Sequence, residues 1–164
     1  MKSEINKSNH FLFKNIFAPL LFLICLEGCT REVLPYDERA NARSDLQAAL
    51  TQAKSKNKLI LIVFGANWCP DCRALANQMA KGKLAERVAE RFIVVKIDVG
   101  NWDKNLDVVY EYGNPIKKGI PAIAVLASDG KLLQSTKAGE LASARSMGEN
   151  SILLVFDKIS ESSL

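Results

Sequence analysis

The sequence predicts an α/β domain with a central mixed sheet and helices on both faces of the sheet. Residues 59–64 are apolar at nearly every position, as in a strand that is buried on both faces. A segment with helical spacing follows, and residues 92–98 form the next strand, so these two strands are expected to be parallel. Residues 128–131, Ser-Asp-Gly-Lys, are a strong turn signal, which predicts an antiparallel hairpin at the end of the sheet.

The first helix is predicted to begin at Ser44, which forms a capping-box pattern with Gln47, and to run to about residue 55. Asn101 or Asp103 is expected to cap the helix that precedes the hairpin, and Gly113 to end it. The other predicted elements are, in order, strand 59–64, a helix to about residue 82, helix 84–91, strand 92–98, strands 122–127 and 132–137, and helix 150–159, whose Ile152, Leu153, Val155 and Phe156 face the sheet.

Composition and charge exclude several classes of protein. The chain has 164 residues, 48% of them hydrophobic and 24% charged, which is ordinary for one globular domain with a short extra segment. The net charge of +4 is not gathered in a Lys/Arg run, so nothing predicts nucleic-acid binding. The only histidine, His10, lies in a segment that we expect to be removed, which excludes a histidine-based site in the mature chain.

The N-terminal segment is typical of a secretory signal. Three lysines precede an apolar run over residues 16–26, which is too short to span a membrane. The run ends in Leu26-Glu27-Gly28-Cys29, which resembles the lipobox of bacterial lipoproteins, although Glu27 departs from that pattern. The resemblance implies acylation of Cys29, with ordinary cleavage or a retained anchor as the alternative. By the same resemblance, Thr30 after the cysteine favours the outer membrane.

This interpretation divides the chain into a signal peptide over residues 1–28, a polar tether over 29–43 and a folded domain over 44–164. A lipid anchor at Cys29 would hold the domain in the cell envelope, facing the periplasm. The four cysteines then leave one free pair in the mature chain, and none for a structural disulfide.

The free pair lies in Trp68-Cys69-Pro70-Asp71-Cys72, where the first strand gives way to a helix. At a helix N-terminus, unpaired backbone N–H groups and the helix dipole favour a thiolate at Cys69. Cys72 lies one turn further on the same face, close enough to close a short disulfide ring. Because no second Cys or His pair exists, the motif cannot complete a four-ligand zinc site. The pair therefore predicts dithiol–disulfide exchange without a metal.

Together with Gly119-Ile120-Pro121 before the strand at 122–127, this motif resembles the thioredoxin superfamily. The resemblance covers about residues 44–160 and includes Gly130 at the hairpin turn and Gly139 before the last helix. It implies a thioredoxin-like fold. Within the superfamily the chain looks like the secreted group that includes single-domain periplasmic and lipoprotein reductases, and it has no room for the inserted helical domain of a large disulfide oxidase.

The resemblance also implies a role for each residue of the site. Cys69 is expected to be an exposed attacking thiolate, and Cys72 the buried thiol that resolves the mixed disulfide. A cis Pro121 would place the backbone of Ile120 beside the sulfur, where it can pair with a substrate strand. A trans proline that merely opens a strand is the alternative.

Two tryptophans are candidates for the substrate surface. Trp68 is expected to cover the disulfide and offer apolar contact to substrate, with packing alone as an equal alternative. Trp102 follows the end of the strand at 92–98, at the sheet edge where α/β sites gather, but a plain core or surface position is favoured for it.

Pro70 and Asp71 are expected to tune the redox potential. Pro70 occupies the first helical position, where its missing N–H costs nothing. Asp71 adds negative charge near the first sulfur, which favours a reductant, whereas the helix dipole and Lys117-Lys118, if their loop faces the site, act in the opposite direction. Thioredoxins carry a buried acid six positions before the first cysteine, where this chain has Val63. Water or another group must take that role, and the candidates are Glu86, Lys96 and Asp98.

The sequence thus predicts an extracytoplasmic thiol–disulfide oxidoreductase that reduces protein disulfides without a bound cofactor. In an oxidising compartment a reductant needs electrons from outside, so a transmembrane electron donor is expected as a second partner. One alternative is a disulfide oxidase or isomerase. The other is a non-enzymatic metal chaperone or assembly factor whose two thiolates hold a soft metal such as Cu(I).

Overall fold

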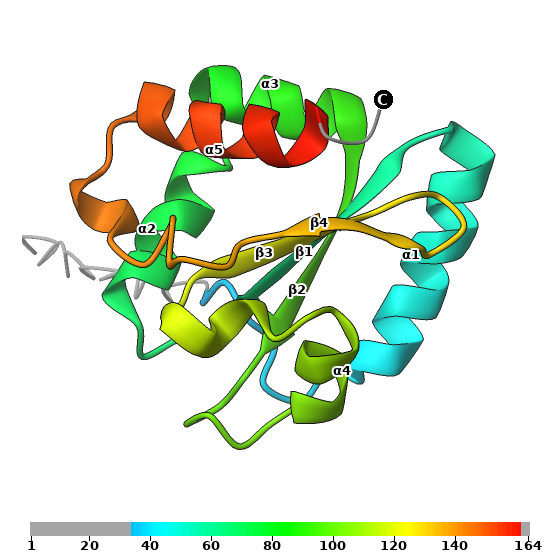
Figure 1. Ribbon diagram of the computed structural model, residues 1–164, viewed down its shortest axis with the longest axis horizontal. Helices are drawn as coiled ribbons and strands as arrows, with labels where there is room; N and C mark the ends of the chain where they lie inside the picture. Colours follow the sequence, from blue (N-terminus) through cyan, green and yellow to red (C-terminus); the bar gives the residue numbers. More distant parts are fainter. Residues whose placement is uncertain (1–33, 162–164) are drawn as a thin grey trace, which may run out of the picture. The chain divides into compact units, whose positions relative to one another are not determined.

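The computed structural model describes residues 34–161, whose arrangement is shown in Figure 1. Within them the sheet has the strand order β2-β1-β3-β4. The strand β1 (Leu59–Gly65) pairs in parallel with β2 (Phe92–Asp98) and antiparallel with β3 (Ala122–Leu126), which forms a hairpin with β4 (Leu132–Ser135). The mixed sheet predicted from the sequence is confirmed.

Helices lie on both faces of the sheet (Figure 1), and the alternation of side chains along β1 explains why. Ile60, Ile62 and Phe64 belong to the core on one face, whereas Leu61 and Val63 belong to the core on the other. The first core includes residues of α1 and α4, and the second includes residues of α2, α3 and α5. The bounds are α1 Ala42–Lys56, α2 Pro70–Gln78, α3 Gly82–Arg91, α4 Leu106–Glu111 and α5 Glu149–Glu161, with two short 3-10 segments, η1 Pro115–Lys118 and η2 Ala144–Ser146.

The packed domain begins before Ser44, where the sequence predicts the first helix. Helix α1 starts at Ala42 because Asn41 caps it: the Asn41 side chain accepts a hydrogen bond from the Ser44 N–H at 3.0 Å. Tyr36, which was expected in a polar tether, is only 3% exposed and lies in the core on the α1 side of the sheet. Residues 34–43 are therefore part of the domain rather than of a tether.

The later elements keep their predicted places with shifted ends. Helix α4 begins after Asn105, which is in a left-handed conformation, so neither Asn101 nor Asp103 caps it. The Asp103 carboxylate instead accepts a hydrogen bond from the Asn101 N–H inside the preceding loop. Four apolar residues of α5 were expected to face the sheet. Ile152 and Phe156 are fully buried, whereas Leu153 and Val155 are half-buried.

No helix within residues 34–161 is long and apolar enough to cross a bilayer. The predicted signal peptide and the predicted lipidation site Cys29 lie outside the described residues.

Candidate active site

The Cys69–Cys72 motif lies where β1 ends and α2 begins. Cys69 is the N-cap of α2, and Pro70 is the first helical residue. The Cys69 Sγ accepts a hydrogen bond from the Cys72 backbone N–H at 3.3 Å, so an orphan donor of the first turn points at the sulfur. Both cysteines are free thiols. The strand-to-helix junction predicted for the motif is confirmed.

Cys69 is buried, which corrects the expectation of an exposed thiolate: only 4% of the residue is accessible. The segment before β3 explains this, because its Ile120–Pro121 peptide bond is cis and brings the Ile120 carbonyl to 3.6 Å from the Cys69 Sγ. The Cys69 thiol donates a hydrogen bond to that carbonyl. The backbone of Ile120 therefore lies beside the sulfur, as the resemblance implies.

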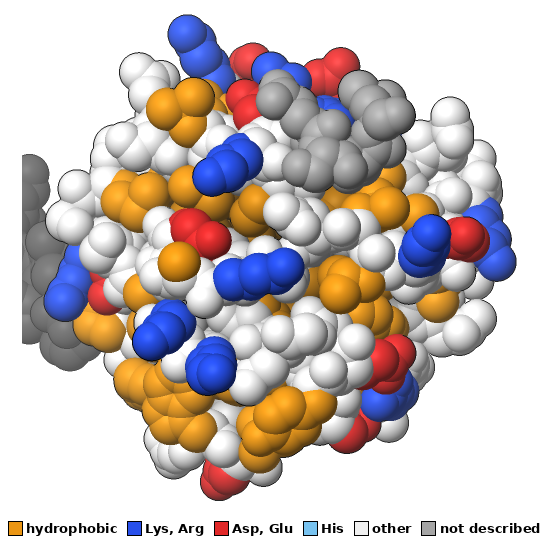
Figure 2. Space-filling model, viewed as in Figure 1, with side chains coloured by type: hydrophobic (Ala, Val, Ile, Leu, Met, Phe, Trp, Pro, Cys, Tyr) orange, Lys and Arg blue, Asp and Glu red, His pale blue; other side chains and the backbone are white. Residues whose placement is uncertain are grey.

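The two tryptophans form an exposed aromatic pair next to the motif. Trp68 is 51% exposed and Trp102 is 44% exposed, and their ring centroids lie 6.3 Å apart. The Trp68 Nε1–H donates a hydrogen bond to the Gly100 carbonyl at 2.8 Å, which fixes the indole to the β2–α4 loop. Figure 2 shows hydrophobic side chains gathered at the lower edge of this face, over that loop and α4, with basic side chains beside them over η1. Trp102, the weaker sequence candidate, thus lies at the site.

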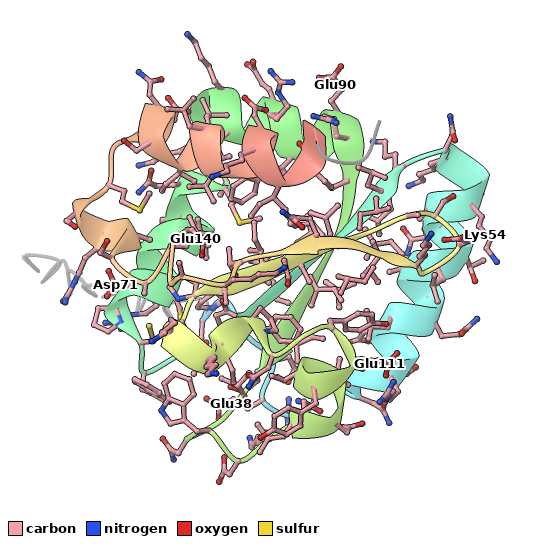
Figure 3. The ribbon with its side chains drawn as sticks, viewed as in Figure 1. Glu38, Lys54, Asp71, Glu90, Glu111 and Glu140 are labelled. Carbon is pink, nitrogen blue, oxygen red and sulfur yellow. The ribbon has the colours of Figure 1, made fainter. Side chains whose placement is uncertain are left out.

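Asp71 has a structural partner that the sequence does not indicate. Its Oδ1 accepts a hydrogen bond from the Arg145 backbone N–H at 3.0 Å, and its Oδ2 lies 3.4 Å from the Arg145 Nε. These contacts join α2 to the η2 segment, next to which Figure 3 shows Asp71. Because the guanidinium offsets the carboxylate charge, the expected effect of Asp71 on the neighbouring sulfur is weakened. Lys117 and Lys118 are exposed on η1, which directly precedes the cis peptide segment.

Cys72 is fully buried beside Tyr36, a residue that sequence reasoning missed. The Tyr36 hydroxyl hydrogen-bonds the Cys72 thiol. Gly65, at the end of β1, leaves the space for this contact: a Cβ on Gly65 would lie 2.2 Å from the Tyr36 Oη and 2.8 Å from the Cys72 Sγ. A larger residue at position 65 would have to displace one of these two atoms.

The surroundings of Cys72 act on its ionisation in both directions. Burial raises the pKa of the Cys72 thiol well above its ordinary value, and the neighbouring Cys69 sulfur raises it further. The Ala66 backbone and the Tyr36 hydroxyl lower it, because each stabilises the thiolate by a hydrogen bond. Burial also raises the pKa of Tyr36, and negative charge on the two cysteines and on Asp98 adds to this. The phenol therefore stays protonated and remains a donor.

Val63 occupies the position where thioredoxins have an acid, and it is buried among apolar side chains. Of the three candidates for that role, Glu86 and Lys96 are exposed. Asp98 is buried and lies opposite Gly65 in the β1–β2 register. Its carboxylate binds the Lys104 Nζ at 3.1 Å. Only Asp98 of the three is placed close to the Tyr36–Cys72 contact.

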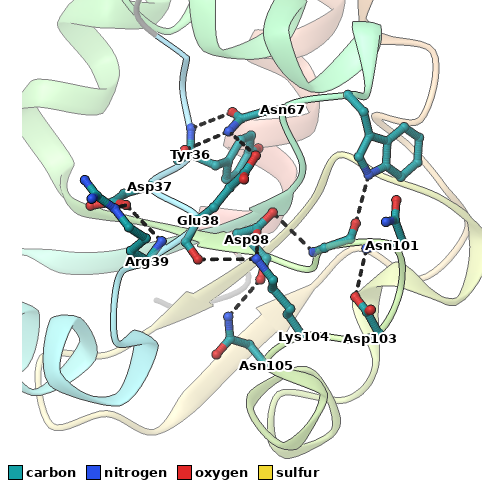
Figure 4. A network of polar contacts seen from close by, with 12 residues as sticks. Tyr36, Asp37, Glu38, Arg39, Asn67, Asp98, Asn101, Asp103, Lys104 and Asn105 are labelled. Atoms are coloured by element: carbon teal, nitrogen blue, oxygen red, sulfur yellow. Dashed lines mark hydrogen bonds and ion pairs between the residues drawn. The ribbon is translucent and has the colours of Figure 1, made fainter.

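Asn67 holds Tyr36 in place and was also missed from the sequence. Its Oδ1 accepts a hydrogen bond from the Tyr36 N–H at 3.0 Å, and its Nδ2 donates to the Tyr36 carbonyl at 2.9 Å and to the Glu38 Oε1 at 3.0 Å (Figure 4). For Tyr36 the only signal in the sequence is that it is a single aromatic residue in a polar segment. The residues that Tyr36 contacts are 29 to 36 positions away along the chain, and no local pattern identifies them.

Comparisons with known proteins agree with this geometry. A sequence profile described as thioredoxin-like matches residues 41–128. The crystal structure of a disulphide isomerase from Xylella fastidiosa Temecula1 matches with a TM-score of 0.76 and 49% identity, over 79% of this chain and 99% of that chain. The chloroplastic thioredoxin-like protein HCF164 of Arabidopsis thaliana is 30% identical over 66% of this chain and 34% of that protein. The thiol:disulfide interchange protein DsbD of Vibrio cholerae is 32% identical over 34% of this chain and 9% of that protein.

The chain spans about a third of the length of the Arabidopsis relative and a smaller part of the Vibrio relative. The profile, in contrast, matches more than half of the chain, and the Xylella structure is matched almost from end to end. The chain therefore belongs to the thioredoxin-like family.

Proposed function

We propose that the protein reduces disulfides of extracytoplasmic protein substrates through Cys69 and Cys72. The observation that carries the proposal is the position of the two free thiols against the cis Ile120–Pro121 segment, with the Cys69 Sγ 3.6 Å from the Ile120 carbonyl. A substrate strand that pairs with this backbone brings its own disulfide to Cys69. The exposed indoles of Trp68 and Trp102 offer apolar contact on the same side.

The exchange takes two steps. The Cys69 thiolate attacks one sulfur of the substrate disulfide, a mixed disulfide forms, and the other substrate sulfur leaves as a thiolate that takes up a proton. The Cys72 thiolate then attacks the Cys69 sulfur, the Cys69–Cys72 disulfide forms, and the second substrate thiolate leaves with the electron pair and is protonated. The substrate gains two electrons and two protons, which the two cysteines lose.

Reduction is the proposed direction, because a strong oxidant owes its potential to a reduced form that is stabilised as a thiolate. Here burial disfavours the thiolate of Cys72. Asp71 adds a carboxylate in the first turn of α2, and its negative charge, which Arg145 partly offsets, also disfavours a thiolate there.

The proposed location is the cell envelope, with the domain facing the periplasm and the outer membrane favoured over the inner. It is supported by the sequence pattern of a signal peptide over residues 1–28 and by the lipobox-like segment that ends at Cys29. A reductant there needs an electron source, so a transmembrane electron donor is the proposed second partner. The partial likeness to the thiol:disulfide interchange protein of Vibrio cholerae supports a part for this chain in thiol–disulfide interchange.

Mixed-disulfide trapping tests the substrate class. A Cys72→Ala variant expressed in the native envelope is expected to retain protein substrates on Cys69, visible as adducts that dithiothreitol releases and mass spectrometry identifies. The matched control is Cys69→Ala, which keeps one thiol and should capture nothing. If Cys72→Ala captures no protein either, the proposed substrate class is wrong.

Disulfide isomerisation is a second candidate, favoured by the description of the Xylella relative as a disulphide isomerase. In isomerisation another thiol of the substrate can release Cys69, so Cys72 is not required for turnover. Refolding of a scrambled disulfide protein separates the two functions. An isomerase retains most of its activity in Cys72→Ala, whereas a reductase loses its multiple-turnover activity.

A metal-binding role has less support. Among the side chains of residues 34–161, no group of three or more His, Cys, Asp or Glu is placed to hold a metal ion. Two thiols alone could hold Cu(I). Stoichiometric copper retained by the purified wild-type protein and lost from Cys69→Ala would favour that role over redox exchange.

A further inference from the structure

The resolving step requires a Cys72 thiolate in a place that disfavours one. Cys72 has no accessible surface, and Val63 supplies no acid to take its proton. The polar side chain that reaches the sulfur is Tyr36, itself only 3% exposed. The position that a Gly65 Cβ would occupy lies 2.2 Å from the Tyr36 Oη and 2.8 Å from the Cys72 Sγ, so both atoms lie over the bare backbone of β1, where the hydroxyl hydrogen-bonds the thiol. The contact thus depends on a glycine at that position.

We propose that Tyr36 is a catalytic residue of the resolving step, an inference that rests on the proposed function. Its hydroxyl donates a hydrogen bond to the Cys72 sulfur and stabilises the thiolate that attacks Cys69. Tyr36 keeps its own proton throughout. Cys72 loses its proton to water, the bond between Cys69 and Cys72 forms, and the bond from Cys69 to the substrate breaks. The substrate thiolate leaves with the electron pair and takes a proton from water.

The charges around the hydroxyl keep it a donor rather than a base. Burial raises the pKa of Tyr36, and the groups that add to this are Cys72 and Cys69 from the motif and Asp98 from β2. Asp98 is in turn bound to the Lys104 Nζ at 3.1 Å. Because each of these acidic groups is negative or becomes negative when it ionises, none of them favours a phenolate. A neutral hydroxyl can stabilise the thiolate without adding a second buried charge.

The residue immediately before the Trp68–Cys72 motif positions the tyrosine. Asn67, two residues before Cys69, bonds both the N–H and the carbonyl of Tyr36, at 3.0 Å and 2.9 Å. On the far side of the same segment, the Lys104 Nζ donates to the Glu38 carbonyl at 3.3 Å (Figure 4). The residues that hold Tyr36 therefore come from the β1–α2 junction and from the loop after β2. Asn67 is a positioning residue of the resolving step, because it acts through Tyr36.

Release of thionitrobenzoate from 5,5′-dithiobis(2-nitrobenzoate), followed at 412 nm on the full chain, separates the two steps. Attack by Cys69 releases the first equivalent, and resolution by Cys72 releases the second. In Tyr36→Phe, which keeps the ring and removes the hydroxyl, the second phase is expected to slow by about tenfold or more, the loss expected for one hydrogen bond to an ion. The first phase and the thermal midpoint should change little.

The pH profile distinguishes this role from a structural one. The rate of the second phase should rise with pH in both proteins, with the Tyr36→Phe rate lower by a constant factor below the pKa of Cys72. The matched control is Tyr112→Phe, which removes the hydroxyl of another buried tyrosine of the same core and should leave both phases unchanged. An unchanged second phase in folded Tyr36→Phe would overturn the role of Tyr36 alone. A wild-type protein that releases no second equivalent would overturn the proposed function as well.

A second measurement needs no variant at the site. With ¹³C-labelled tyrosine in the wild-type chain, the Tyr36 Cζ signal is expected to move when the Cys69–Cys72 pair is oxidised, because the hydroxyl loses its thiol partner. The Tyr112 signal should stay in place. A Tyr36 signal that does not respond to oxidation would contradict the contact on which the proposal depends.

Discussion

Replacing Asn67 by alanine should loosen the segment that carries Tyr36. Asn67 is 8% exposed and makes three hydrogen bonds, two of them to the backbone of Tyr36 and one to Glu38. Its loss leaves the N–H and the carbonyl of Tyr36 without these partners. A buried polar group without a partner costs about 1–3 kcal/mol, so the two groups together cost about 2–6 kcal/mol. Local detachment of the segment, which lets water reach these groups, limits the loss to the lower part of that range.

Urea unfolding and amide hydrogen exchange measure the effect of Asn67→Ala. The free energy of unfolding is expected to fall by about 2 kcal/mol, and the Tyr36 amide should lose its protection even where the sheet keeps its own. Asn77→Ala is the matched control, because Asn77 is exposed on α2 and should change stability by less than about 0.5 kcal/mol. If Asn67→Ala behaves like Asn77→Ala in both measurements, Asn67 does not hold Tyr36.

Three further changes test other contacts. Gly65→Ala should lower the free energy of unfolding by about 1–3 kcal/mol in urea titration, because the new methyl group overlaps the Tyr36 hydroxyl and the Cys72 sulfur; an unchanged midpoint would refute that overlap. Trp102→Ala should raise KM for a protein disulfide while the rate with a small aromatic disulfide stays the same, and an equal loss with both would speak against a substrate surface. Burial raises the pKa of Glu140, but backbone N–H groups that donate to its carboxylate outweigh this and hold the pKa below its ordinary 4.5. Its contribution to stability is therefore present above about pH 4.5 and is lost as the pH falls through the lowered pKa, so Glu140→Gln should flatten the acid side of the stability curve; a curve parallel to that of the wild type would contradict this.

Most of the fold could be predicted because local patterns specify it. The apolar run of β1, the Asp-Gly turn of the hairpin and the helical spacing after the motif each depend on neighbouring residues only. The start of α1 was misplaced for a similarly local reason. The capping box begins at Ser44, but Asn41 stands three residues earlier, and in the structure its side chain bonds the Ser44 backbone and caps the helix instead.

The site could be predicted only in part. Cys69, Cys72 and Pro121 belong to short motifs whose residues lie together in the sequence, and the structure brings them together. Tyr36 could not be placed in the same way, because its contact with Cys72 depends on the tertiary path of a segment that looks polar. The exposure of Cys69 was misjudged because the cover comes from Ile120, 51 positions away in the chain.

The reduction potential of the Cys69–Cys72 pair tests the central claim most directly. It is measured by equilibrating the full chain with thiol–disulfide buffers of known potential and quantifying the oxidised fraction after acid quenching and alkylation. For a reductase of protein disulfides we expect a value close to that of thioredoxin, about −270 mV. A value close to that of strong periplasmic oxidants, about −120 mV, or a pair that does not form a disulfide at all, would contradict the proposed function.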